Sequence, residues 1–180
     1  YENKEVKKII KKNPVIFVPN HCDYKDGPTC FFLFPNSALL IAKDWYEKKK
    51  INWYLRNNLC VPMDRFNVDT AWLRLAKDAV KGGNSIIIYP EGKTRQEEEP
   101  DEFKSGFIML AMLTGAKIIP FATGEKYNAV FGRRQRVLVG EPMLLTEENK
   151  GMNPKYLSEE SERFRQAVIQ LQNQLKQERK

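Results

Sequence analysis

Short runs of consecutive apolar residues recur along the chain, and segments with helical spacing of their apolar positions separate them. Unbroken apolar runs, unlike runs that alternate with polar residues, are typical of strands covered on both faces of a sheet. Strands are therefore predicted over residues 15–18, 38–41, 59–61, 85–89, 117–121 and 136–139.

The intervening segments predict helices. The clearest begins after Asp69, a predicted N-cap, ends at Gly82, and carries one apolar stripe of Trp72, Leu75, Ala76, Ala79 and Val80. A second helix is predicted over residues 105–113, before Gly115. The last is predicted over residues 158–180, with a stripe of Phe164, Val168, Leu171 and Leu175. This short stripe favours packing against the domain over a coiled-coil partner.

Strands that alternate with helices predict an α/β fold, in which a mostly parallel or mixed central sheet is covered by helices on both faces. A chain of 180 residues can bury one core and fits a single domain over residues 1–180. Residues 1–13 predict a basic amphipathic lead-in helix, in which lysines surround Val6, Ile9 and Ile10. Packing on the domain and docking on a membrane surface are both open to this helix.

Charge and cysteine content narrow the function classes. Thirty Lys and Arg against 23 Asp and Glu give a formal charge of +7, which favours phosphates, anionic lipid or nucleic acid as partners. The three cysteines, Cys22, Cys30 and Cys60, lack C-x-x-C spacing, so neither a disulfide framework nor a metal site is expected. The apolar run at residues 108–113 is far too short to cross a bilayer. A chain that begins at Tyr1 rather than Met leaves room for a native N-terminal anchor.

His21, the single histidine, follows the first predicted strand, at the edge where α/β proteins usually bind ligands. On one continuous helix His21 and Asp26 would point to different sides, but a turn that leads into a helix at Gly27 lets them converge. A carboxylate on one imidazole nitrogen fixes the tautomer, and the other nitrogen can then take a proton from a hydroxyl. This pairing predicts a general base whose nucleophile is supplied by the substrate.

A second polar loop follows the predicted strand over residues 85–89 and reads Pro90-Glu91-Gly92-Lys93-Thr94-Arg95. Gly92 permits close approach of the backbone to a ligand, and Glu91 can hold a hydroxyl or orient a cation. Lys93 and Arg95 supply positive charge for a phosphate. Both polar loops are expected at the carboxyl edge of the sheet, which makes a shared site the favoured interpretation over two unrelated turns.

Together these segments resemble the glycerolipid acyltransferases, whose first motif is NHxSxxD and whose third is FPEGTRS. Asn20, His21 and Asp26 match the first motif, and residues 89–92 match the start of the third. Residues 61–65, which end in Asp-Arg, resemble the second motif, and residues 118–121 resemble the fourth. The four blocks fall in family order over residues 14 to 142.

This resemblance implies specific roles. His21 would be the general base, Asp26 its orienting partner, and Arg65 and Glu91 would bind the acceptor. Gly92 would bring the backbone near the phosphate, and Lys93 and Arg95 would add charge there. Direct attack by the acceptor hydroxyl on the thioester, without a covalent acyl-enzyme, is the implied mechanism, and no metal or other cofactor is expected.

Two positions depart from the family pattern. Asp23 stands where the first motif has Ser and adds a carboxylate near the base. After Gly92, either Lys93 and Thr94 replace the usual Thr-Arg, or one residue is inserted and Arg95 keeps the arginine role. The insertion is favoured, because a guanidinium can grip a phosphate with two hydrogen bonds and a threonine cannot.

The resemblance also implies the substrates. The expected reaction moves a fatty acyl chain from acyl-CoA or acyl carrier protein to the hydroxyl of lysophosphatidic acid, in phospholipid synthesis. Glycerol-3-phosphate or another lipid is the alternative acceptor, and a non-catalytic domain that binds anionic lipid or nucleic acid is the alternative class. No nucleic-acid signature is present, so an anionic membrane surface is the expected partner, and a peripheral position on the cytoplasmic face is the expected location.

Four other features of the sequence are open to an ordinary structural interpretation. Cys22 adjoins His21, but neighbouring residues on an extended chain point to opposite sides, which argues against a thiol nucleophile. The acidic residues 96–102 favour a solvated loop over a flap that shields the site. The aromatic and basic segment 45–56 suits either a lipid headgroup boundary or a core helix with a charged outer face. Residues 31–34 suit core packing more than an acyl channel.

Overall fold

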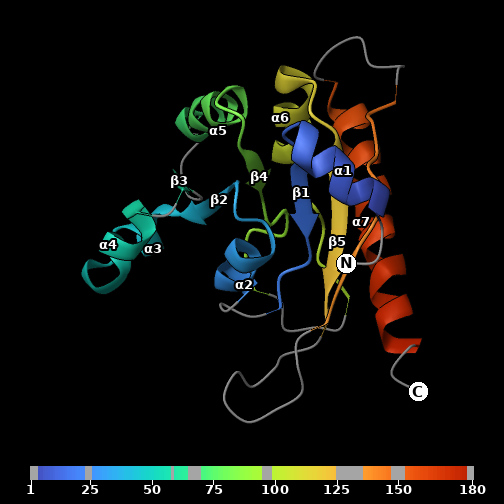
Figure 1. Cartoon of the computed structure of the whole chain (residues 1–180). Helices are drawn as coiled ribbons and strands as arrows, with labels where there is room; N and C mark the ends of the chain where they lie inside the picture. Colours follow the sequence, from blue (N-terminus) through green and yellow to red (C-terminus); the bar gives the residue numbers. More distant parts are fainter. Residues whose placement is uncertain are drawn as a thin grey trace.

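A computed structural model describes residues 4–22, 26–57, 59–64, 70–94, 99–124, 136–146 and 153–177. Its centre is a six-stranded sheet in the order β3-β2-β4-β1-β5-β6. The strands are β1 (Ile16–Pro19), β2 (Ser37–Ala42), β3 (Cys60–Met63), β4 (Ser85–Ile87), β5 (Ile118–Thr123) and β6 (Val137–Val139). The first five are parallel (Figure 1). Strand β6 pairs antiparallel with β5. The prediction of a mostly parallel or mixed central sheet is confirmed.

Helices cover both faces of the sheet, as predicted. On one face α5 (Ala71–Lys81), α6 (Gly106–Thr114) and α7 (Pro154–Gln177) pack on alternate strand residues such as Ile16 and Val18. On the other face α1 (Lys4–Lys12) and α2 (Asp26–Leu33) pack on Val15 and Phe17. Adjacent residues of β1 therefore serve opposite layers, which is why its apolar run is unbroken.

Helix α1 uses its apolar stripe for packing. Val6 is 1% exposed, and Ile9 and Ile10 are partly buried against the apolar cluster that contains Val15 and Phe17. The amphipathic pattern predicted for residues 1–13 thus reflects a helix that lies on the sheet.

The ends of three helices can be compared with the predictions. Helix α7 begins at Pro154 rather than residue 158, because Pro154 suits the first helical turn and the Asn153 side chain accepts the Lys155 N–H at 2.9 Å. Helix α6 ends at Gly115, as predicted, with φ of 68°. The predicted N-cap Asp69 lies outside the described residues, and Thr70 precedes α5.

Two short helices occupy the segment between β2 and β3. They are α3 (Lys43–Tyr46) and α4 (Lys49–Asn57), and they lie at the β3 edge of the sheet, away from the other helices (Figure 1). Only Leu55 is buried in α4, so the alternative of a core helix does not hold there. Among the helices of the described residues, none is long and apolar enough to span a bilayer.

Candidate active site

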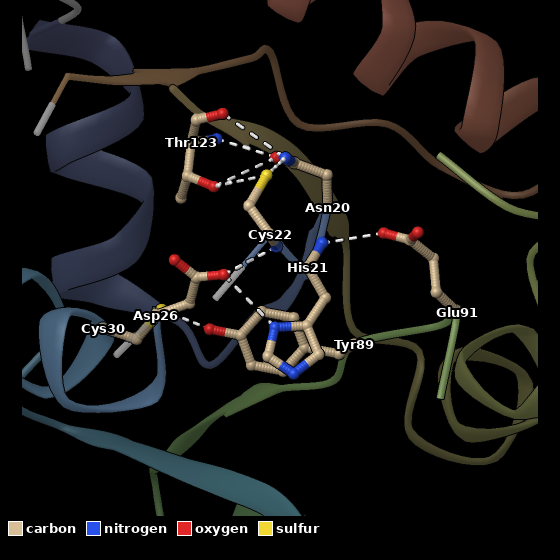
Figure 2. Close-up of polar contacts among 8 residues, drawn as sticks. All are labelled: Asn20, His21, Cys22, Asp26, Cys30, Tyr89, Glu91 and Thr123. Carbon is tan, nitrogen blue, oxygen red and sulfur yellow. Dashed lines mark hydrogen bonds and ion pairs between the residues drawn. The ribbon is translucent and has the colours of Figure 1, made fainter. Parts of the chain in front are cut away.

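The two polar loops predicted from the sequence meet at the carboxyl edge of the sheet (Figure 2). His21 follows β1, and Tyr89 to Gly92 follow the adjacent strand β4. Thr123, the last residue of β5, lies on the other side of β1. The parallel order of these strands brings all three carboxyl ends together, as expected for an open α/β sheet.

His21 and Asp26 form the pair that the sequence predicts. Nδ1 of His21 lies 3.2 Å from Oδ2 of Asp26, and this carboxylate oxygen also accepts the Cys22 N–H at 2.8 Å. Asp26 is fully buried in the first turn of α2, where the amino end of the helix favours a negative charge. His21, two residues after β1, and Asp26, in the first turn of α2, therefore converge although they are five positions apart.

Tyr89 forms a platform under the imidazole. The ring centroids of His21 and Tyr89 are 4.2 Å apart, and the rings are inclined by 31°. The Tyr89 hydroxyl lies 3.1 Å from Sγ of Cys30 on α2. Burial raises the pKa of Tyr89 well above its usual value, and the neighbouring Cys30 and Asp26 act in the same direction, so the phenol stays neutral.

The turn that carries His21 is fixed to β5 by Asn20. Its Oδ1 accepts the Thr123 N–H at 2.7 Å, and its Nδ2 donates to the Thr123 carbonyl at 3.3 Å and to Sγ of Cys22 at 2.8 Å. Asn20 is fully buried and Cys22 is 4% exposed. The Cys22 thiol points toward Thr123 while the imidazole points toward Tyr89 (Figure 2), in keeping with the argument against a thiol nucleophile.

Glu91 connects the turn after β1 to the segment after β4. Its Oε1 accepts the His21 N–H at 2.7 Å, and its Oε2 accepts the Asp101 N–H at 3.1 Å. The side chain is only 3% exposed. Glu91 therefore holds the backbone on which the imidazole is mounted, a contact that the sequence did not predict; its role in acceptor binding stays a prediction.

Two lysines flank the turn at Gly92, whose φ is 70°. A Cβ on Gly92 would lie 3.2 Å from Nζ of Lys104, so Lys104 reaches across the glycine. Lys93 is 69% exposed and pairs with Asp101 at 3.0 Å. Asp101 is thus part of an ordered turn, and Arg165 of α7 donates to its carbonyl and to that of Pro100.

The remaining predicted residues, Arg65 and Arg95, lie outside the described residues, as does Asp23. Sequence reasoning missed Lys104 and the parts played by Tyr89 and Thr123. A signal existed for Tyr89, an aromatic residue that stands beside the motif turn, but no spacing rule marks Lys104 or Thr123 as neighbours of the histidine.

The fold and the His21–Asp26 pair describe an α/β protein with a histidine and a carboxylate at the carboxyl edge of its sheet, and comparison with known proteins identifies its family. The family model described as Acyltransferase matches residues 2–124, more than half of the chain. The chain therefore belongs to the Acyltransferase family.

Named relatives agree with this assignment. The 1-acyl-sn-glycerol-3-phosphate acyltransferase of Cocos nucifera is 33% identical over 114 residues, which cover 58% of this chain and 35% of that protein. The protein of that name from Bacillus subtilis (strain 168) is 23% identical over 141 residues, which cover 77% and 70%. The chain thus spans about a third of the plant protein.

The crystal structure of the 1-acyl-sn-glycerophosphate (LPA) acyltransferase, PlsC, from Thermotoga maritima aligns with a TM-score of 0.67 and 22% identity. The alignment covers 92% of this chain and 69% of that chain, and it shows a shared fold.

Proposed function

We propose that the protein transfers a fatty acyl chain from a thioester donor to the hydroxyl of 1-acylglycerol-3-phosphate. The observation that carries this proposal is the His21–Asp26 pair. Nδ1 of His21 lies 3.2 Å from Oδ2 of Asp26, and the His21 side chain is 19% exposed. Among the described residues, none hydrogen-bonds to Nε2 of His21. Family membership supports the reaction class, and the names of the relatives support the acceptor.

The proposed mechanism uses His21 as the base. Because the Asp26 carboxylate accepts a hydrogen bond from Nδ1–H, Nε2 carries the lone pair and takes the proton of the acceptor hydroxyl. The hydroxyl oxygen attacks the thioester carbonyl, the carbon–sulfur bond breaks, and the new ester forms. The departing thiolate takes the proton back from Nε2, which returns His21 to its starting state. Asp26 stabilises the imidazolium between these two steps.

The acceptor phosphate is assigned to the turn at Gly92. Lys104 reaches across this glycine, and the exposed Lys93 follows it in sequence, so two lysines supply positive charge at the turn. Arg65 and Arg95 remain proposed contributors. The donor is acyl-CoA or acyl carrier protein, no further cofactor is required, and the proposed location is peripheral, on the cytoplasmic face of an anionic membrane.

A panel assay tests the reaction. Purified protein is incubated with lysophosphatidic acid, glycerol-3-phosphate and a lysolipid that lacks phosphate, each with both donor types, and the products are identified by mass. We expect phosphatidic acid from lysophosphatidic acid. Product from glycerol-3-phosphate alone would move the assignment to that acceptor, and no product with any pair would overturn the proposal.

Two substitutions test the base. His21→Ala should lower kcat by at least about 100-fold, and Asp26→Asn should lower it by a similar order, because general-base catalysis typically contributes about 10²–10⁴. Circular dichroism checks that both variants fold. The control is Lys77→Ala, on α5 at the amino edge of the sheet. It should keep the activity of the unsubstituted protein.

A further inference from the structure

Helices α3 and α4 carry a surface that the proposed acyl transfer does not use. We name it the aromatic–basic surface. Its members are exposed residues of α3, α4 and the link between them: Lys43, Trp45, Lys48, Lys49, Lys50, Trp53, Tyr54 and Arg56. Five cations stand there against two exposed carboxylates, Asp44 and Glu47. The surface is therefore positive as well as aromatic.

Its aromatic side chains face solvent to an unusual degree. Trp53 is 74% exposed, Trp45 41% and Tyr54 39%. Helix α1, by contrast, buries its apolar positions on the sheet. Large apolar side chains that cluster in solvent mark an interaction site, because exposing them to water is unfavourable.

The cations are interleaved with these rings. Nζ of Lys48 lies 3.4 Å from the centroid of the Trp45 ring. Lys49 and Lys50 open α4 one turn before Trp53, and Arg56 closes it. An aromatic ring with a cation beside it suits the headgroup level of a bilayer, where the ring meets the acyl boundary and the cation meets phosphate.

The position of the surface connects it to the candidate active site. Helix α3 starts at Lys43, directly after the last residue of β2. Because β2 runs parallel to β4 and β1, α3 leaves the sheet from the same carboxyl edge that carries His21. Figure 1 shows both helices beyond β3, at the lateral edge of the sheet.

We propose that the aromatic–basic surface docks the protein on an anionic lipid bilayer, with Trp53 and Trp45 at the headgroup level and the lysines on lipid phosphates. This inference rests on the proposed function, because a lysophospholipid acceptor resides in the membrane. Docking by α3 and α4 brings the carboxyl edge of the sheet close to the bilayer that holds the acceptor.

Vesicle binding tests the cations. The full chain is sedimented with phosphatidylcholine vesicles, with and without phosphatidylserine. Replacing Lys48, Lys49 and Lys50 with Ala should weaken binding to anionic vesicles by about 100-fold, since each cation near an anionic surface contributes roughly fivefold. The matched control replaces Lys77, Lys81 and Lys117, which line a hollow of about 400 Å³ at the opposite, amino edge of the sheet. This control should bind within about twofold of the unsubstituted protein.

Fluorescence tests the aromatic residues. Trp45→Phe combined with Trp72→Phe leaves Trp53 as the reporter, and lipids brominated on the acyl chain should quench it when anionic vesicles are added. Trp72 packs on the core cluster around α6. A protein with Trp45→Phe and Trp53→Phe therefore reports only Trp72 and should remain unquenched.

The proposal is overturned if loss of Lys48, Lys49 and Lys50 leaves vesicle affinity unaffected, or if lipid bromine does not quench the Trp53 signal. Salt-sensitive binding to an oligonucleotide, without vesicle binding, would also overturn it in favour of nucleic acid. His21→Ala separates docking from catalysis. It should bind vesicles like the unsubstituted protein, whereas the triple lysine variant should keep turnover of a short-chain acceptor dissolved in water.

Discussion

The imidazole of His21 lies against the ring of Tyr89, with 4.2 Å between ring centroids. The contact is held from both sides: Asp26 fixes Nδ1 of the imidazole, and Cys30 hydrogen-bonds the Tyr89 hydroxyl. An aromatic face attracts a cation, so this platform favours the imidazolium that forms while the base carries the acceptor proton. Tyr89 is thus a positioning residue for the proposed base.

Two substitutions of Tyr89 distinguish the contribution of its ring from that of its hydroxyl. Tyr89→Phe keeps the ring and should retain kcat within about threefold, whereas Tyr89→Leu should lower kcat by roughly 10-fold, the size of a partly desolvated cation–π contact. KM should change little in both, because Tyr89 acts through His21. Steady-state kinetics checks the split. A Leu variant with unchanged kcat, or one affected only in KM, would contradict the platform role.

Glu91 is predicted to stabilise the fold as well as the site. Glu91→Gln keeps one acceptor oxygen but presents an amide N–H to one of the two backbone donors, at His21 or Asp101. A buried donor without its partner costs about 1–3 kcal/mol, so the free energy of unfolding in urea should fall by that amount. The loss of the His21 contact should also lower kcat.

The control for Glu91 is Glu102→Gln, an exposed carboxylate after the same turn. It should change the free energy of unfolding by less than about 0.5 kcal/mol. Equal stability of the two variants would show that the hydrogen bonds of Glu91 contribute nothing measurable.

The success and failure of sequence reasoning have physical causes at particular residues. The unbroken apolar run at Ile16 to Val18 predicts a strand with two covered faces, because side chains alternate in direction. The pairing of His21 and Asp26 could be predicted because the two residues are only five positions apart, so their convergence is local information. The partners of Glu91 are backbone N–H groups, which every residue but proline offers, so no residue type marks them. Strand order, which brings β4 and β5 to either side of β1, is likewise not local information.

Asn20 illustrates the non-local part, since its partner Thr123 is 103 positions away. Asn20→Ala removes the acceptor of the buried Thr123 N–H and should lower the free energy of unfolding by about 1–3 kcal/mol. Thr123→Val leaves that N–H bonded and removes only the hydroxyl, whose contact with Asn20 is longer, at 3.4 Å. Chemical denaturation should therefore rank Asn20→Ala as clearly the less stable; the reverse order would contradict the assignment.

The reactivity of the thiols follows from their burial. Desolvation raises the pKa of Cys30 to about 12 and that of Cys60 to about 11. At pH 8 the native protein should therefore react slowly with iodoacetamide, with Cys60, which is partly accessible, alkylated before Cys30. Peptide mass spectrometry of timed samples, with urea-unfolded protein as the reference, measures each rate. Alkylation of Cys30 at the unfolded rate would contradict its burial.

Stability at alkaline pH tests the same thiol thermodynamically. Burial raises the pKa of Cys30 from 9.0 to about 12, with the nearby Asp26 adding to the rise and the Tyr89 hydrogen bond opposing it. Between these values the unfolded chain releases the proton while the folded protein keeps it. The free energy of unfolding then falls by about 1.4 kcal/mol per pH unit from this group, and the contribution is complete below pH 9. Urea unfolding at pH 9 to 11 should show a shallower fall for Cys30→Ala than for the unsubstituted protein, whatever their absolute stabilities. Parallel slopes for the two proteins would show that the Cys30 thiol ionises equally in both states, which its burial among α2, Tyr89 and Asp26 forbids.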